Sequence, residues 1–187
     1  KRFDELPLGS GALATTAFVA MHVATAAAGL TWSLIEWSKH GRPTVRGIIT
    51  GAVAGLVAIT PASGFVNPVG AIWIGIGAAG LCYLSAVVLK AKLGYDDTLD
   101  AFGVHGVGGI WGALATGLFA TKAVNPGGAD GLFYGNPAQF VVQIKATLVT
   151  VAWSFAMSFV LLKAVNALMG ARTAESEERI GLDLTGH

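Results

Sequence analysis

Five apolar stretches with few charged groups constrain the fold of this chain more than any other feature of its sequence. A helix needs about 20 apolar residues to cross a bilayer, and a backbone inside lipid must satisfy its own hydrogen bonds. The stretches lack the strict alternation of a barrel strand, which favours helices. We therefore predict an all-α integral membrane protein with spans within residues 11–37, 47–60, 66–89, 98–120 and 145–169. An earlier start of the last span, at Pro137, is left open.

Composition supports the membrane class and excludes several others. Charged residues make up 12 % of the chain, about half their share in soluble domains. The net charge of +1 gives no indication of nucleic-acid binding. Cys82 is the only cysteine, which excludes an intrachain disulfide and a multi-cysteine metal site. The sequence has no phosphate-binding loop, dinucleotide fingerprint, metal-ligand spacing or nucleophile elbow. We therefore expect no enzymatic activity, no metal and no cofactor.

The domain organisation follows from the polarity of the chain. Residues 1–10 form a polar N-terminal segment, which is either part of a larger product or an artificial junction. Residues 11–170 form the five-helix transmembrane domain, and residues 171–187 form a charged tail. Cytoplasmic loops carry an excess of Lys and Arg. This bias predicts a cytoplasmic C-terminus, because most of these residues fall on one face: Lys39, Arg42, Arg46, Lys90, Lys92, Arg172 and Arg179.

Small residues recur at a spacing of four in two of the predicted spans. Such ladders let helix backbones approach closely inside lipid. The ladders are Gly47, Gly51 and Gly55 in one span, and Gly109, Ala113 and Gly117 in another, with Gly108 and Gly112 offset by one residue.

The first of these two spans, 47–60, is short for a transmembrane helix, so its flanking residues have to complete it.

His105 is the leading candidate for a functional residue. It is the only ionisable group between residues 101 and 120, and a histidine at that depth is costly to bury. Ala101 and Gly109 share its helical face, which leaves room before the imidazole. It could pass a proton or bind a small polar solute. The competing interpretation is a structural histidine bonded to a neighbouring helix. For His22, an interhelical or subunit-contact bond is favoured.

Three carboxylates precede His105, namely Asp96, Asp97 and Asp100. They cap the N-terminus of the helix, or they form a negative vestibule that attracts small cations. Asp100 lies five residues before His105, so we expect it on another face. Thr50 and Val53 share a helical face and would suit a pore wall, although a threonine inside a helix often bonds its own backbone.

The stretch Asp-Asp-Thr-Leu-Asp-Ala-Phe-Gly-Val-His-Gly-Val-Gly-Gly-Ile-Trp-Gly, residues 96–112, resembles the signature of the ammonium transporter family (Amt/Mep/Rh). Residues 24–28, 51–62 and 178–187 agree with it. The bacterial Amt branch fits best. The resemblance implies a homotrimer with eleven helices per subunit and a narrow pore in each. The five predicted spans then correspond to the second of two inverted five-helix repeats.

The family also assigns roles to particular positions. His105 matches the second of two facing pore histidines. Thr50, Val53 and Ala101 match pore-lining positions, and Asp100 matches a recurrent acidic residue at the cytoplasmic end. The tail, with Gly181, Leu182 and Asp183, resembles the regulatory region that helps to dock a PII signalling protein in bacteria.

Several elements of the family pattern are missing from this sequence. The first pore histidine, the acidic residue of the outer recruitment site and the stacked phenylalanines belong to the first half of the family fold. We therefore expect this chain alone not to form a complete path, whether another chain or a longer polypeptide supplies the rest.

The expected function is ammonium transport across the cell membrane, with ammonium deprotonated and ammonia conducted, because a bare ammonium ion is expensive to desolvate. An ammonium sensor signalling through the tail is the alternative. A non-transporting structural half and a gas channel that carries carbon dioxide are less favoured.

Overall fold

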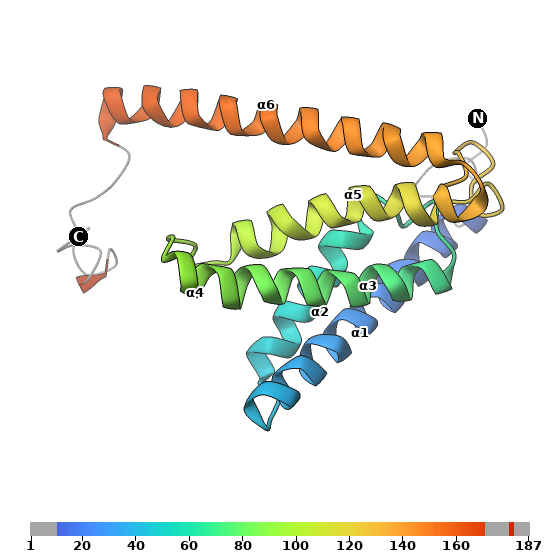
Figure 1. The fold of residues 1–187 in the computed structure, drawn as a ribbon, viewed down its shortest axis with the longest axis horizontal. Helices are drawn as coiled ribbons and strands as arrows, with labels where there is room; N and C mark the ends of the chain where they lie inside the picture. Colours follow the sequence, from blue (N-terminus) through green and yellow to red (C-terminus); the bar gives the residue numbers. More distant parts are fainter. Residues whose placement is uncertain (1–10, 171–179, 182–187) are drawn as a thin grey trace. The chain divides into compact units, whose positions relative to one another are not determined.

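The computed structural model describes residues 11–170 and 180–181, and all regular secondary structure in these residues is helical. The described residues up to Thr147 form one compact unit, and those from Leu148 onward form a second. The elements are labelled as in Figure 1: α1 (Ala12–His40), α2 (Val45–Ile59), α3 (Pro68–Tyr83), η2 (Leu84–Leu89), α4 (Lys90–Leu93), η3 (Ala101–Gly106), α5 (Val107–Phe119), η4 (Leu132–Tyr134) and α6 (Pro137–Met169).

The prediction of an all-helical membrane protein is confirmed. Among the described residues, four helical stretches are long and apolar enough to cross a bilayer: Ala12–His40, Pro68–Leu93, Ala101–Phe119 and Pro137–Met169. The last begins at Pro137, the earlier of the two starts considered. Helix α2 has 15 residues and is shorter than a span, as the sequence indicated.

The N-termini of α2 and α3 are determined by capping residues in the local sequence. The Thr44 hydroxyl accepts a hydrogen bond from the Gly47 N–H at 2.9 Å and begins α2. The Asn67 side chain accepts one from the Gly70 N–H, also at 2.9 Å, and begins α3. Short polar side chains satisfy the free N–H groups of a first helical turn in this way. Both starting points were therefore encoded locally.

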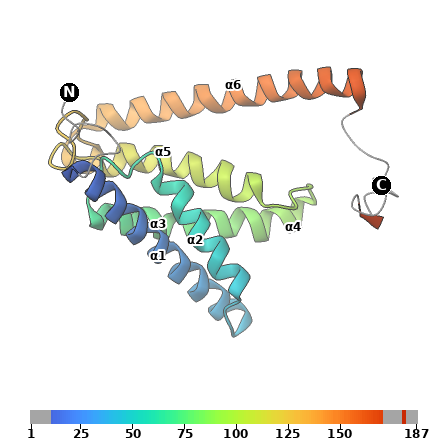
Figure 2. The same ribbon diagram turned by 180° about the vertical axis from the view of Figure 1, so that it is seen from behind.

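In the first unit, α1 and α2 form an antiparallel pair, and α3 and α5 form another that contacts it (Figures 1 and 2). The α1–α2 contact depends on glycine. A β-carbon on Gly55 would lie 2.7 Å from the Ala24 carbonyl oxygen, and one on Gly51 would lie 2.6 Å from the Trp32 β-carbon. The predicted ladder of Gly47, Gly51 and Gly55 is buried throughout.

The second predicted ladder packs only in part, since Gly117 is buried and the offset Gly108 and Gly112 take the place of Gly109. Gly108 and Gly112 are buried. A β-carbon on Gly112 would meet the Ala58 backbone of α2, and one on Gly108 would lie 3.2 Å from the Cys82 sulfur of α3. A β-carbon on Gly109 would meet nothing within 4 Å. The rotation of α5 against α2 and α3 decides that Gly108 and Gly112, and not Gly109, face these two helices.

Two π-helical segments, η2 and η3, pack against each other. A β-carbon on Gly103 would lie 2.9 Å from the Ala86 α-carbon, so the two backbones are close. In a π-turn the N–H bonds the carbonyl five residues earlier, and the Val107 N–H contacts the Phe102 carbonyl in that way. This wider turn determines which side chains of η3 share a face.

Candidate functional site

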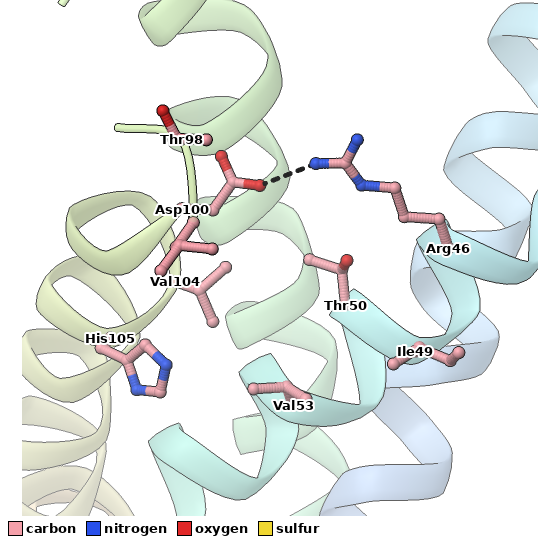
Figure 3. A pocket seen from close by; sticks show the side chains of 9 residues that line it. Arg46, Ile49, Thr50, Val53, Thr98, Asp100, Val104 and His105 are labelled. Carbon is pink, nitrogen blue, oxygen red and sulfur yellow. Dashed lines mark ion pairs between the residues drawn. The ribbon is translucent and has the colours of Figure 1, made fainter. Parts of the chain in front are cut away.

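A cavity of about 240 Å³ lies between α2 and the segment that leads into η3 (Figure 3). One wall comes from α2 and the other from residues 98–105. The lining residues are Arg46, Ile49, Thr50, Val53, Thr98, Leu99, Asp100, Val104 and His105. Four sequence candidates therefore meet in one place, namely Thr50, Val53, Asp100 and His105.

The α2 wall is a single helical stripe. Arg46, Ile49, Thr50 and Val53 lie at positions i, i+3, i+4 and i+7, which is the spacing of one helical face. Sequence reasoning identified Thr50 and Val53 and missed the other two, because Arg46 was counted only as a loop charge. Extending the Thr50–Val53 face back by one turn would have found both.

Thr50 differs from several other helical threonines. Thr25, Thr31 and Thr116 each donate their hydroxyl to the carbonyl four residues back, at 2.7 to 2.8 Å. Within the part of the chain that the structure describes, the Thr50 hydroxyl has no hydrogen-bond partner. The hydroxyl is therefore available to a solute in the cavity. It does not bond its own helix backbone, which is the more common arrangement for a threonine in a helix.

The opposite wall brings Asp100 and His105 into the same cavity, contrary to the expectation that they lie on different faces. That expectation assumed an α-helix. Asp100 instead has a left-handed backbone with φ of 54°, and the residues that follow it are π-helical. The wider π-turn brings residues five apart nearly into register. Figure 3 shows Asp100 towards one end of the cavity and His105 towards the other.

His105 is exposed in this chain and faces aliphatic neighbours, among them Val53 and Val104 (Figure 3). Its ring nitrogens have no protein partner among residues 11–170 and 180–181. The other two described histidines do: His22 contacts the Phe18 carbonyl at 2.8 Å, and His40 contacts the Tyr83 hydroxyl at 3.4 Å. One ring nitrogen of His22 thus bonds its own helix, and the predicted interhelical or subunit contact of this residue stays a prediction. The His105 imidazole retains a donor and an acceptor for a ligand.

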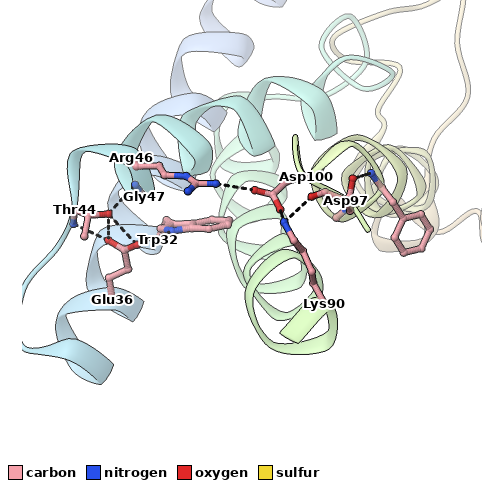
Figure 4. A network of polar contacts seen from close by, with 10 residues as sticks. Trp32, Glu36, Thr44, Arg46, Gly47, Lys90, Asp97 and Asp100 are labelled. Carbon is pink, nitrogen blue, oxygen red and sulfur yellow. Dashed lines mark hydrogen bonds and ion pairs between the residues drawn. The ribbon is translucent and has the colours of Figure 1, made fainter. Parts of the chain in front are cut away.

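The three carboxylates before His105 have different roles (Figure 4). Asp97 accepts hydrogen bonds from the N–H groups of Phe102 and Gly103 at 3.3 and 3.0 Å, so it caps η3. Asp96 accepts one from the Thr98 hydroxyl at 3.1 Å. Helix capping therefore accounts for Asp97 and not for all three.

Asp100 joins three elements through ion pairs (Figure 4). Its Oδ1 lies 2.6 Å from Lys90 Nζ of α4, and its Oδ2 lies 3.5 Å from a guanidinium nitrogen of Arg46 of α2. Lys90 also donates to the Asp97 carbonyl oxygen at 2.6 Å. The Asp100 carboxylate therefore has two cationic partners, and it is not an unpaired negative charge at the cavity mouth.

The start of α2, where Arg46 lies, is tied to the end of α1. Both Glu36 oxygens contact the Thr44 hydroxyl, at 3.0 and 3.1 Å, and the Thr44 N–H donates to Oε2 at 2.7 Å. This carboxylate ties the last turns of α1 to the start of α2 (Figure 4). Arg46 lies in the first turn of α2, so these contacts fix its backbone beside the cavity.

The remaining candidates lie elsewhere. Ala101 is exposed at the start of η3 and is not among the cavity-lining residues in the described part of the chain. Gly181 has a φ of 106°. Leu182 and Asp183 lie outside the described residues, as do most of the tail and residues 1–10.

The family model described as Ammonium Transporter Family matches residues 6–187. The chain belongs to the ammonium transporter family. It is 50 % identical over 175 residues to an ammonium transporter of Bacillus subtilis, covering 94 % of this chain and 43 % of that protein. The resemblance to the family and its bacterial branch is thereby confirmed.

Solved structures agree with the sequence match. The crystal structure of Candida albicans Mep2 superposes with a TM-score of 0.83 at 35 % identity, over 90 % of this chain and 38 % of that chain. A structure named Sensor Amt Protein gives a TM-score of 0.81 at 27 % identity, over 92 % of this chain and 42 % of that one. The chain spans about two fifths of the length of the ammonium transporter relatives it matches.

Proposed function

We propose that this chain forms part of an ammonium transporter, and that the cavity between α2 and η3 is one wall of its conduction path. One observation carries the proposal: a histidine without a protein partner and a threonine with a free hydroxyl share a cavity with aliphatic side chains. Family membership supplies the substrate class, since the Bacillus subtilis relative is named an ammonium transporter.

The chemistry favours conduction of neutral ammonia. Val53, Val104 and Ile49 offer no charge to replace the hydration shell of an ammonium ion, and desolvating a bare cation in such surroundings is costly. Ammonia needs only one or two hydrogen bonds, which the Thr50 hydroxyl and the His105 imidazole can make. Ammonium would be deprotonated before this stretch.

The wider assembly follows from the family and the charge distribution. The chain would act as the second inverted half of the fold, in a homotrimer in the cell membrane, with its C-terminus in the cytoplasm. The remaining length of the relatives would complete the path, and Ala101 would face that missing half. The tail residues Gly181, Leu182 and Asp183 would help to dock a PII signalling protein.

The test is transport by the full-length protein carrying His105→Ala. Uptake of labelled methylammonium should fall at least tenfold, or its selectivity over potassium should be lost. His22→Ala is the matched control, because His22 bonds only its own helix and should retain uptake. Normal uptake and selectivity after His105→Ala would contradict the proposal.

A second function, ammonium sensing, is favoured by the likeness to the structure named Sensor Amt Protein. A sensor would bind ammonium without net transport and transmit the signal through the tail. Binding of ammonium by the full-length protein without uptake into vesicles would support this alternative over the transporter.

A further inference from the structure

Arg46 has a role at the cavity that its place in a basic loop does not explain. It lines the cavity, and its side chain is 82 % exposed. It lies at the end marked by Asp100 and Thr98, with His105 and Val53 at the other end (Figure 3). A solute that moves between that end and His105 therefore passes the guanidinium.

The charges around this end show what Arg46 adds. Asp100 is already paired with Lys90 at 2.6 Å, the closer of its two cationic partners. The carboxylates of Glu36 and Asp97 do not line this cavity, and they bond Thr44 and backbone N–H groups of η3. Arg46 is thus not needed as the sole partner of Asp100. It places a positive charge directly on the cavity wall.

We propose that Arg46 is a specificity-determining residue that disfavours the entry of monovalent cations at this end of the cavity. The inference rests on the proposed transport function. A fixed positive charge lowers the local concentration of ammonium, potassium and other cations, and it leaves neutral ammonia unaffected. Arg46 therefore increases the preference for ammonia over ammonium at the end of the cavity that lies before its apolar side chains.

The experiment compares variants of the full-length protein reconstituted into lipid vesicles. Ammonium or potassium is applied from the Arg46 side, and cation current is recorded at low and at high ionic strength. Arg46→Gln removes the charge, and Arg46→Lys keeps it. Arg42→Gln is the matched control, since Arg42 is exposed in the same loop region and lies outside the cavity lining of the described residues.

Arg46→Gln should raise the cation current roughly three- to tenfold at low salt, because a unit charge acts at short range near a partly solvated surface. The increase should shrink at high salt, where the charge is screened. Arg46→Lys and Arg42→Gln should match the unsubstituted protein. Because salt also screens the Arg46–Asp100 ion pair, the salt dependence is read together with a chemical modification of the same position.

A chemical modification experiment tests the same charge effect in case Arg46→Gln does not fold. In Arg46→Cys, the introduced thiol is modified by a cationic or a neutral reagent of similar size, while Cys82 is buried and protected. The cationic reagent should lower the cation current relative to the neutral one.

Two results would overturn the inference: equal low-salt currents for Arg46→Gln and the unsubstituted protein, or equal currents after the two reagents. Absence of ammonium transport by the unsubstituted protein would instead remove the proposed function, and the inference with it.

Discussion

The two faces of α2 differ in what their side chains do. One face carries Gly47, Gly51 and Gly55, and at Gly51 and Gly55 it packs so closely on the α1 backbone that a β-carbon has no space. The other carries Arg46, Ile49, Thr50 and Val53 and lines a cavity. Within one helix, close packing on the first face leaves the second free to carry chemistry. Substitutions on the packing face should therefore change stability, and those on the cavity face should change transport.

The largest effect on stability is expected from Gly55→Ala. The new β-carbon would lie 2.7 Å from the Ala24 carbonyl oxygen and 2.8 Å from the Ala28 β-carbon, so backbone has to shift. We expect the free energy of unfolding to fall by about 2 kcal/mol, after the gain in helix propensity is counted. Thermal unfolding of the detergent-solubilised full-length protein measures it.

Gly80→Ala is the control for that substitution, since a β-carbon on Gly80 would meet nothing within 4 Å. It should leave stability unchanged or raise it by up to about 1 kcal/mol. Equal losses in both variants would show that the tight α1–α2 contact is not what distinguishes the packing face.

An intermediate effect is expected from Asp97→Asn, which acts on the wall opposite α2. The charged carboxylate caps η3 through the N–H groups of Phe102 and Gly103, and the neutral amide can accept only through its one oxygen. We expect a loss of about 1 kcal/mol in stability. Hydrogen exchange at residues 101–106 should rise more than in α1, and uniform exchange would argue against a local role.

The smallest effect on stability is expected from Thr50→Val on the cavity face. Valine has nearly the same shape as threonine. The Thr50 hydroxyl makes no hydrogen bond among the described residues, so the substitution removes none. The unfolding temperature should stay within experimental error, while methylammonium uptake should fall by about threefold through loss of one hydrogen bond. A lower stability with unchanged uptake would reverse the distinction between the two faces.

Much of this protein can be predicted from the sequence because the determinants are local. Long apolar stretches in lipid permit few structures other than helices, so the helices and the membrane class followed from hydropathy. The capping of η3 by Asp97 is encoded within six residues. The motif around His105 identified the family directly.

Relations between helices required the tertiary structure. Asp100 and His105 line one cavity because a π-turn follows a left-handed residue, and helical periodicity alone placed them apart. Arg46 became a cavity residue only when α2 was positioned against η3. Gly108 and Gly112, and not Gly109, pack against neighbours because the rotation of α5 is set by its contacts with α2 and α3. The sequence by itself determined which segments are helical, since that depends on neighbouring residues in the chain. The tertiary structure decided which faces meet, because that depends on backbone approach between segments far apart in the sequence.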